Sequence, residues 1–306
     1  MKINSLIALA LSALIALLSA CAAPPPAEKS TEPPPPANLL GSTDELQLVT
    51  ELSLDLARTY GGEKVLVVLD IDNTLLSMEQ DLGSDQWYYW QKALEEEDPC
   101  SPLLVDDRLA VQGALYFASA MRPTQEDAAK QVARMQEGGL RVIVLTARGP
   151  GFRLATFREL RRNGFNFWTN AWPPQKGFGE GFIPEGGTRP AVYEDGVLFA
   201  AGQDKGLTLK SMLQKSGQPF PTLIVMADDK QSNLNQVMQA FAWLPTQVHA
   251  WRYTREDAVV EAFDPDKAAA LWSELKPPLE RIEELLGPDN YDLPPAGTVR
   301  KGCEKM

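Results

Sequence analysis

The chain has 306 residues, of which 44% are hydrophobic and 23% charged. This balance is ordinary for a globular protein with a substantial core. The formal net charge of −12 argues against a nucleic-acid-binding protein, because no surplus of cations exists to displace the counterions of a phosphate backbone. The single histidine, His249, lies in a strand-like pattern and is too little for a histidine-based metal site. We therefore expect any chemistry here to be carboxylate chemistry.

Residues 1–20 have the features of a signal peptide, in which Lys2 precedes the apolar run Leu6–Leu18. This run is too short to span a membrane comfortably. The sequence LSAC that ends at Cys21 resembles a bacterial lipobox, in which the cysteine becomes the lipidated first residue. We therefore expect a cell-envelope protein anchored to the membrane through Cys21. Ala22, in place of an aspartate, favours the outer membrane, facing the periplasm. An ordinary secretory signal that contains a cysteine is the alternative.

Residues 21–42 carry two runs of proline, which predict an extended tether of about 3 Å per residue. A proline-rich recognition motif is the alternative. At the other end, residues 288–306 are predicted to form a polar C-terminal tail. Cys100 and Cys303 would form a disulfide to this tail if they pair in an oxidising compartment, and the sequence leaves that pairing open.

Residues 43–287 are predicted to form one α/β domain, because apolar β-forming runs alternate with helical patterns. The expected strands are Lys64–Leu69, Arg141–Leu145, Thr222–Met226 and Gln247–Tyr253. A first helix is expected to begin at a capping box at Ser42–Glu45 and to end at Tyr60. The other expected helices are Thr124–Glu137, Phe152–Asn163, Leu207–Lys215, Lys230–Leu244 and Arg255–Leu286. The last of these is expected to be broken near Pro265 and at Pro277-Pro278. This alternation predicts a Rossmann-like α/β fold, with a parallel sheet and helices on both faces.

Two stretches do not fit the strand and helix alternation and are predicted to be insertions. The first, at about residues 77–122, is a cap and contains the aromatic sequence WYYW at Trp87–Trp90. These rings either stack on a ligand or fill the core of the cap itself. The second insertion, at about residues 173–197, is rich in glycine and has a predicted hairpin turn at Glu194–Gly196.

Side chains suited to phosphate chemistry stand at the carboxyl ends of three expected strands and just before one expected helix. They are Asp70, Asp72, Thr146, Lys205, Asp228 and Asp229. Ligands of such sheets bind beyond the carboxyl ends of the strands, so we expect these side chains to share one crevice. Mg²⁺ prefers oxygen ligands, and carboxylates together with a substrate phosphate would complete its shell. Lys205 would help to offset the charge of that phosphate.

Each of these side chains has a role in the hydrolysis of a phosphate monoester. An aspartate such as Asp70 can attack phosphorus and divide one hard displacement into two easier ones. Asp72 can donate a proton to the leaving oxygen and then accept one from water. Thr146 can donate a hydrogen bond to a phosphoryl oxygen. Lys210 competes with Lys205, but its place within a helix is typical of a solvated charge.

The sequence DIDNTLL at Asp70–Leu76 resembles motif I, D-x-D-x-T, of the haloacid dehalogenase superfamily. Thr146, Lys205 and the pair Asp228-Asp229 resemble motifs II, III and IV of that superfamily, and they occur in the same order. The resemblance implies the superfamily's version of the α/β fold, with a cap. The chain is also similar to the secreted lipoprotein acid phosphatases of the superfamily.

By this resemblance, Asp70 is the nucleophile and a metal ligand, and Asp72 is the acid and base and binds the metal through its carbonyl. Thr146 and Lys205 bind the phosphoryl group. Asp228 completes a Mg²⁺ site, with support from Asp229. The second aspartate of motif I distinguishes the phosphatases of the superfamily from its carbon–halogen hydrolases.

The sequence therefore predicts a Mg²⁺-dependent phosphatase acting on a small-molecule phosphate ester, without a nucleic-acid partner. A phosphotransferase is the nearest alternative. A non-catalytic surface lipoprotein that binds a ligand or partner is the alternative from another class. Asp228 and Asp229 could also serve only as a helix N-cap, and Arg148 could contact substrate or be solvated. The sequence does not predict the substrate or the oligomeric state.

Overall fold

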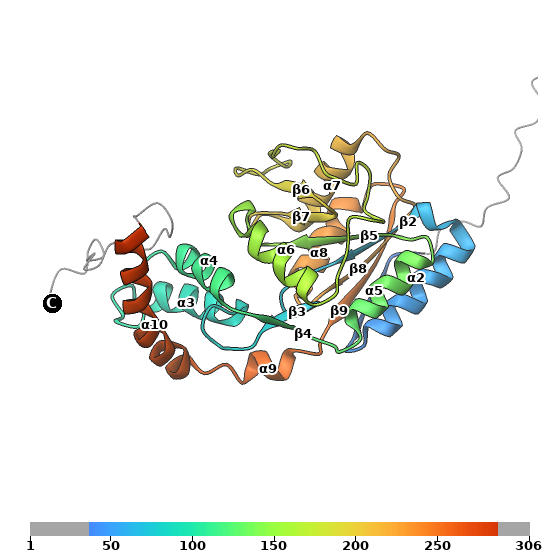
Figure 1. Cartoon of the computed structure of the whole chain (residues 1–306). Coiled ribbons are helices and arrows are strands. Elements are labelled where there is room, and N and C mark those ends of the chain that lie inside the picture. Colours follow the sequence, from blue (N-terminus) through green and yellow to red (C-terminus); the bar gives the residue numbers. More distant parts are fainter. Residues whose placement is uncertain (1–36, 287–306) are drawn as a thin grey trace, which may run out of the picture. The chain divides into compact units, whose positions relative to one another are not determined.

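The structure is a computed structural model, and it describes residues 37–286 (Figure 1). The predicted signal peptide, the lipidation site Cys21, most of the tether and the C-terminal tail lie outside the described residues. Cys100 is disulfide-bonded, whereas Cys303, its expected partner, lies outside the described residues. No helix in the described part of the chain is long and apolar enough to cross a membrane.

A seven-stranded sheet forms the centre of the fold. Its spatial order is β1 (Leu39–Thr43), β9 (Gln247–Tyr253), β8 (Leu223–Asp228), β2 (Val65–Leu69), β5 (Arg141–Thr146), β7 (Val197–Phe199) and β6 (Val192–Glu194). All neighbouring strands pair in parallel except β6, which pairs antiparallel with β7. The predicted α/β class, with a largely parallel sheet, is confirmed.

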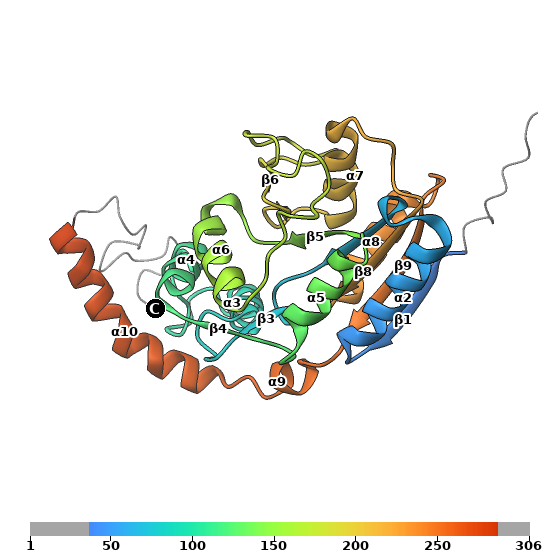
Figure 2. The same ribbon diagram turned by 45° about the vertical axis from the view of Figure 1, so that its right-hand side comes forward.

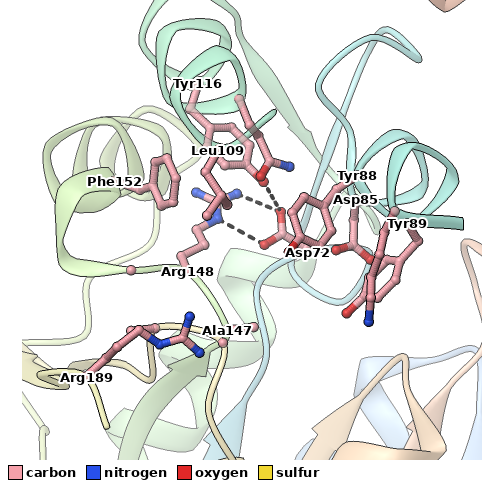
Figure 3. Close-up of a pocket in the computed structure, with 15 residues that line it drawn as sticks. Asp72, Asp85, Tyr88, Tyr89, Leu109, Tyr116, Ala147, Arg148, Phe152 and Arg189 are labelled. Atoms are coloured by element: carbon pink, nitrogen blue, oxygen red, sulfur yellow. Dashed lines mark hydrogen bonds and ion pairs between the residues drawn. The ribbon is translucent and has the colours of Figure 1, made fainter. Parts of the chain in front are cut away.

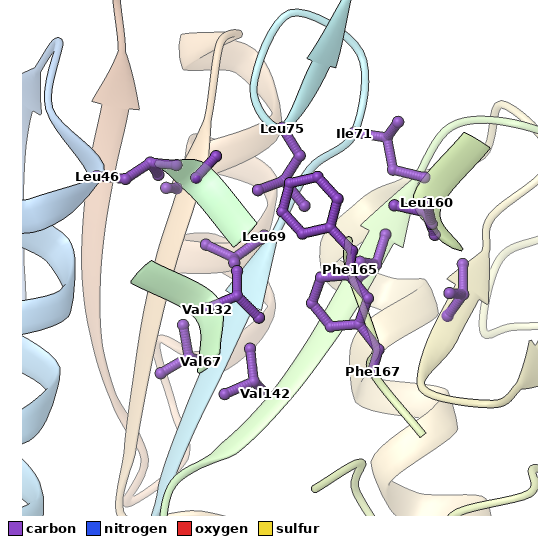
Figure 4. Packing of buried hydrophobic residues seen from close by; sticks show 14 of the residues in the cluster. Leu46, Val67, Leu69, Ile71, Leu75, Val132, Val142, Leu160, Phe165 and Phe167 are labelled. Atoms are coloured by element: carbon purple, nitrogen blue, oxygen red, sulfur yellow. The ribbon is translucent and has the colours of Figure 1, made fainter. Parts of the chain in front are cut away.

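Helices cover both faces of this sheet. One face carries α2 (Leu46–Tyr60), α5 (Ala128–Glu137) and α6 (Arg153–Arg162), and the other carries α7 (Lys205–Ser216) and α8 (Gln231–Phe241). The residues of β2 are all buried and alternate between the two faces, as the two-residue period of a strand requires. Val67 and Leu69 face Val132 of α5 in one core (Figure 4), whereas Leu66 and Val68 pack in the other. Burial on both faces explains why this strand is continuously apolar.

A smaller layer lies beyond the carboxyl end of β2. It contains the two-stranded sheet of β3 (Leu76–Met78) and β4 (Met121–Pro123), the helices α3 (Asp85–Glu97) and α4 (Arg108–Ala118), and the C-terminal helix α10 (Pro265–Leu286), which follows α9 (Asp257–Glu261). Short 3-10 turns occupy Gly62–Lys64 and Pro150–Phe152. Helix α10 runs beside α3 and α4 (Figures 1 and 2) and contributes Ala268 and Leu279 to their apolar cluster. The cap insertion thus packs against a helix from the other end of the domain.

The helix break expected at Pro277-Pro278 is wrong, because both prolines lie inside α10. Each proline removes one backbone N–H donor from the helix. Leu279, which is 9% exposed, packs into the cluster with α3 and α4. This burial offsets the lost hydrogen bonds and lets the helix continue.

The start of the domain also differs from the expectation. Strand β1 begins at Leu39, inside the segment predicted to be a tether, and Ser42 and Thr43 end this strand rather than begin a helix. Its backbone pairs in parallel with β9, from Leu39 beside His249 to Thr43 beside Tyr253. The expected capping box is therefore wrong, because Ser42 and Thr43 belong to the strand that pairs with β9 and do not begin the helix.

The hairpin predicted at Glu194–Gly196 is confirmed. It joins β6 to β7, and both turn residues have positive φ angles, 46° at Asp195 and 79° at Gly196. An aspartate and a glycine tolerate this left-handed conformation better than most residues. The hairpin adds an antiparallel edge strand to the main sheet.

Gly206 of α7 lies directly against the backbone of α8. A Cβ atom on Gly206 would lie 2.1 Å from the carbonyl oxygen of Gln236 in α8. Gly206→Ala is therefore expected to destabilise the protein by about 2 kcal/mol, because overpacking outweighs the better helix propensity of alanine. Urea unfolding measures this difference. Gly151→Ala is the control, since a Cβ there meets no atom within 4 Å, and equal stability of the two variants would contradict the account.

Candidate active site

Three carboxylates, two of them buried and that of Asp229 half-buried, meet at the carboxyl ends of two adjacent strands. Asp70 follows β2, Asp228 ends β8, and Asp229 follows it. Carboxylate oxygens of the three residues all lie within 4.8 Å of one another. The pairing of β2 with β8 brings them together, and the Asp70 N–H extends the ladder by donating to the Ala227 carbonyl at 3.0 Å. The structure therefore brings together the acidic residues expected after two of the three strands.

Lys205 bridges two of these carboxylates. Its Nζ lies 2.8 Å from Oδ1 of Asp70 and 2.7 Å from Oδ2 of Asp228. Burial alone would lower the pKa of Lys205, but the charges of Asp228 and Asp70 raise it above its usual value. The ammonium group therefore stays charged although only 1% of the residue is exposed. Lys210 instead pairs with the exposed Glu185.

One ammonium group does not balance three carboxylates. Burial and the charge of Asp228 raise the pKa of Asp70 to about 7, against the lowering effect of Lys205. Burial and the charge of Asp70 raise the pKa of Asp229 to about 9. Ionising all three groups is therefore costly without a further cation. An all-oxygen donor set with surplus negative charge fits a hard divalent ion such as Mg²⁺.

Local hydrogen bonds fix the two loops that carry these carboxylates. Asn73 has a positive φ of 58°, so the chain turns sharply after Asp72, and the Asn73 N–H donates to the Leu76 carbonyl at 2.9 Å. The hydroxyl of Thr74 then accepts from the Asp229 N–H at 3.0 Å. The threonine of the D-x-D-x-T sequence thereby ties the loop after β2 to the loop after β8.

Asp228 is also held by the first turn of α8. Its Oδ1 accepts from the Lys230 N–H at 2.9 Å and from Nδ2 of Asn233 at 2.8 Å. The alternative role as a helix N-cap is wrong, because the N-cap residue of α8 is Lys230, without a side-chain cap hydrogen bond. One carboxylate oxygen serves the helix, and the other faces Lys205.

Asp72 points to a different partner. Arg148 donates two hydrogen bonds to the carboxylate of Asp72, from Nε to Oδ2 at 2.9 Å and from an Nη atom to Oδ1 at 2.7 Å. Tyr116 adds a long hydroxyl contact of 3.4 Å, and its ring lies 4.2 Å from the Arg148 guanidinium carbon. Burial would raise the pKa of Asp72, but Arg148 lowers it below its usual value. The carboxylate of Asp72 therefore belongs to this ion pair and not to the acidic cluster.

Thr146 lies fully buried at the end of β5. Its hydroxyl accepts from the Arg148 N–H at 3.1 Å, so it shapes the loop that presents Arg148. The hydroxyl keeps its proton for a further acceptor. Arg148 is 5% exposed, and the solvated alternative for it is wrong. The sequence signal for the ion pair of Arg148 with Asp72 was the position of Arg148 two residues after a buried strand.

A second ion pair joins the cap to the loop after β8. Lys230 lies 2.6 Å from Oδ2 of Asp85 in α3, and its ammonium lies 3.8 Å from the ring centre of Tyr89. Burial would lower the pKa of Lys230, but the charges of Asp85 and Asp229 raise it. Sequence reasoning missed this pair because its members are 145 residues apart.

A cavity of about 400 Å³ opens above Asp72 and Arg148, between the cap and the sheet (Figure 3). Tyr88 and Tyr89 of the WYYW sequence line it, whereas Trp87 is buried in the cluster of the cap and Trp90 packs on Phe263. The interpretation as core of the cap holds for Trp87, Trp90 and part of Tyr88, whereas stacking of Tyr88 and Tyr89 on a ligand stays a prediction. The volume is typical of a small-molecule site.

The fold and this site define an α/β protein whose buried acidic cluster has the oxygen donors of a metal-dependent active site. The family described as "Protein of unknown function (DUF2608)" matches residues 45–283, well over half of the chain. The chain belongs to this family. Comparisons with curated proteins and with solved structures give no match.

Proposed function

We propose that the protein is a Mg²⁺-dependent phosphatase of the haloacid dehalogenase type that hydrolyses phosphate monoesters. The observation that carries the proposal is the cluster of Asp70, Asp228 and Asp229 with Lys205 bridging two of them. The D-x-D-x-T sequence supports it, because Thr74 ties the nucleophile loop to the metal-binding loop. Asp70 lies at the end of the central strand, where substrates of such sheets bind.

The residues of the site supply both halves of a hydrolysis. An oxygen of Asp70 attacks the phosphorus, the ester P–O bond breaks, and the leaving oxygen takes a proton from Asp72. A water then attacks the aspartyl phosphate and gives its proton to the carboxylate of Asp72, which releases inorganic phosphate and restores Asp70. The lowered pKa of Asp72 favours the carboxylate that the second step requires, whereas the first step requires the protonated form, so the negative charge of the bound phosphate must raise this pKa in the substrate complex.

Lys205 and Thr146 are the groups proposed to hold the transferred phosphoryl oxygens. Lys205 supplies a buried positive charge, and Thr146 a hydroxyl proton at the end of the neighbouring strand β5. Mg²⁺ held by Asp70, Asp228 and Asp229 would add Lewis-acid stabilisation of the phosphoryl charge. Arg148 positions Asp72 through its two hydrogen bonds.

The test is phosphate release by the full chain from p-nitrophenyl phosphate and a panel of nucleotides and sugar phosphates. Activity is expected in millimolar Mg²⁺ and is expected to be lost in EDTA, because the phosphate would then face uncompensated carboxylates. Restoring Mg²⁺ should restore the rate. Equal rates with Mg²⁺ and EDTA would contradict the metal assignment. Metal binding without phosphate release from any substrate would favour the non-catalytic alternative.

A further inference from the structure

The cavity above Asp72 contains more positive charge than the reaction uses. Its charged lining residues are Asp72, Asp85, Lys92, Arg148 and Arg189. Arg148 is paired with Asp72 and Lys230 with Asp85, so both carboxylates already have cations. Lys92 and Arg189 form no ion pair with any described residue. The cavity of this acidic protein thus offers two free cations to a ligand.

Arg189 is the better placed of the two, because its backbone is anchored. Gln203 accepts from the Arg189 N–H at 3.0 Å and donates to its carbonyl at 2.9 Å. The same amide group of Gln203 donates to the Ala200 carbonyl at 2.9 Å. A single side chain therefore fastens the loop of Arg189 to the turn that follows β7. Both side chains are exposed, and Lys92 lies on α3, on the part of the cavity wall that the cap forms.

The turn after β7 also fixes Arg189 relative to the reactive groups. The Ala201 N–H donates to the Arg148 carbonyl at 3.1 Å, and the Gly202 N–H to the Ala147 carbonyl at 2.7 Å. Ala201 has a positive φ of 54°, which is unusual for a residue with a side chain. A Cβ on Gly202 would lie 3.6 Å from a terminal nitrogen of Arg189, so the guanidinium lies over this turn. Figure 3 shows Arg189 reaching towards Ala147, on the wall that carries Arg148.

The rest of the cavity suits the body of a small organic ligand. Tyr88, Tyr89, Tyr116 and Phe152 place aromatic rings around it. A ligand with its phosphate near Asp72 would have these rings and Arg189 as neighbours in the same cavity. A guanidinium that is free of carboxylates binds an anionic group through two parallel hydrogen bonds.

We infer that Arg189 binds a second anionic group of the substrate, a carboxylate or a second phosphate, at the wall of the cavity that Ala147 and Gly202 form. This inference rests on the proposed function and narrows its substrate class. The preferred substrates are phosphate monoesters whose alcohol portion carries another negative charge. Arg189 is then a specificity-determining residue and takes no part in proton transfer.

The test measures binding rather than turnover, with two phosphonates that differ by one carboxylate. Isothermal titration in Mg²⁺ compares phenylphosphonate with 4-phosphonobenzoate on the full chain. The carboxylated compound is expected to bind wild-type protein about tenfold more tightly, as for a charge-assisted hydrogen bond. R189A should bring this ratio to about one while leaving the affinity for phenylphosphonate within about twofold. R189K should keep part of the preference for the carboxylated compound, because lysine retains the positive charge but lacks the paired N–H donors of the guanidinium.

R161A is the matched control, since Arg161 is also exposed and its Nε donates to the Phe157 carbonyl of its own helix. It removes the same charge and should leave the ratio at its wild-type value. Equal binding of both phosphonates by the wild-type protein, or an unchanged preference in R189A, would overturn the inference alone. A wild-type protein that binds neither phosphonate would overturn the proposed phosphate site, and the inference with it.

Discussion

Replacing Asp70 by asparagine is expected to lower kcat for phosphate release by about 10⁴-fold or more, because an amide cannot serve as the nucleophile. The substitution keeps the shape of the side chain, and its amide oxygen can still accept from Lys205, which lies 2.8 Å from Oδ1 of Asp70. It also removes one of three crowded carboxylates. The thermal unfolding midpoint should therefore stay close to the wild-type value. Steady-state kinetics and a thermal melt of the same preparation measure both quantities.

Asp195→Asn is the matched control for this experiment. Asp195 is exposed in the turn between β6 and β7, where its φ of 46° is one that asparagine also tolerates. The control should retain wild-type kcat. Substantial phosphate release by Asp70→Asn, with an unfolding midpoint like that of the wild type, would remove Asp70 from the chemistry.

Replacing Lys205 by methionine is expected to have the largest effect on stability. The change keeps most of the apolar volume but removes the ammonium that pairs with Asp70 and Asp228. Breaking a buried ion pair on one side leaves uncompensated charge, at a cost of about 3–5 kcal/mol in the free energy of unfolding. Urea unfolding in EDTA measures this loss. Millimolar Mg²⁺ should recover part of it, because a bound cation would compensate the same carboxylates.

Lys210→Met is the control within the same helix. Lys210 pairs with Glu185, whose side chain is 56% exposed, and such a surface pair contributes about 0–1 kcal/mol. The control should unfold at nearly the wild-type urea concentration, with or without Mg²⁺. Equal losses for the two variants, or a loss at Lys205 that Mg²⁺ does not change, would contradict a cation site next to this lysine.

The acidic cluster could be predicted from the sequence because its position depends on strand order and local pattern. A parallel sheet places the ends of β2 and β8 at one edge, and the residues after those strands are Asp70 and the pair Asp228-Asp229. Lys205 was identifiable from its place just before an expected helix and from its resemblance to motif III of the superfamily, and the structure extends that helix to begin at Lys205. The structure brings Asp229 fully into this cluster.

The partners of these residues could not be predicted, because they come from distant parts of the chain. Asp72 is 76 residues from Arg148, and Lys230 is 145 residues from Asp85. A sequence pattern fixes which residues share a face, but it does not fix how the cap lies on the sheet. For the same reason, the WYYW sequence did not reveal which rings face the cavity.

Differences at the two ends of the domain have a common cause. Strand β1 and helix α10 both depend on tertiary packing that overrides local signals. The Ser-x-x-Glu sequence at Ser42 predicts a helix start, but pairing with β9 satisfies more backbone groups. The two prolines at 277 and 278 predict a helix end, but burial of Leu279 against the cap keeps the helix intact.

The most direct test of the central claim is the capture of beryllofluoride, which mimics a phosphoryl group by bonding to a carboxylate oxygen. ¹⁹F spectra of the full chain with beryllium and fluoride, with and without Mg²⁺, report the bound form without any need for a substrate. New bound resonances that require Mg²⁺ are expected in the wild-type protein and should disappear in Asp70→Asn. Bound resonances that persist in Asp70→Asn, or their absence from the wild-type protein in Mg²⁺, would contradict Asp70 as a metal-assisted nucleophile.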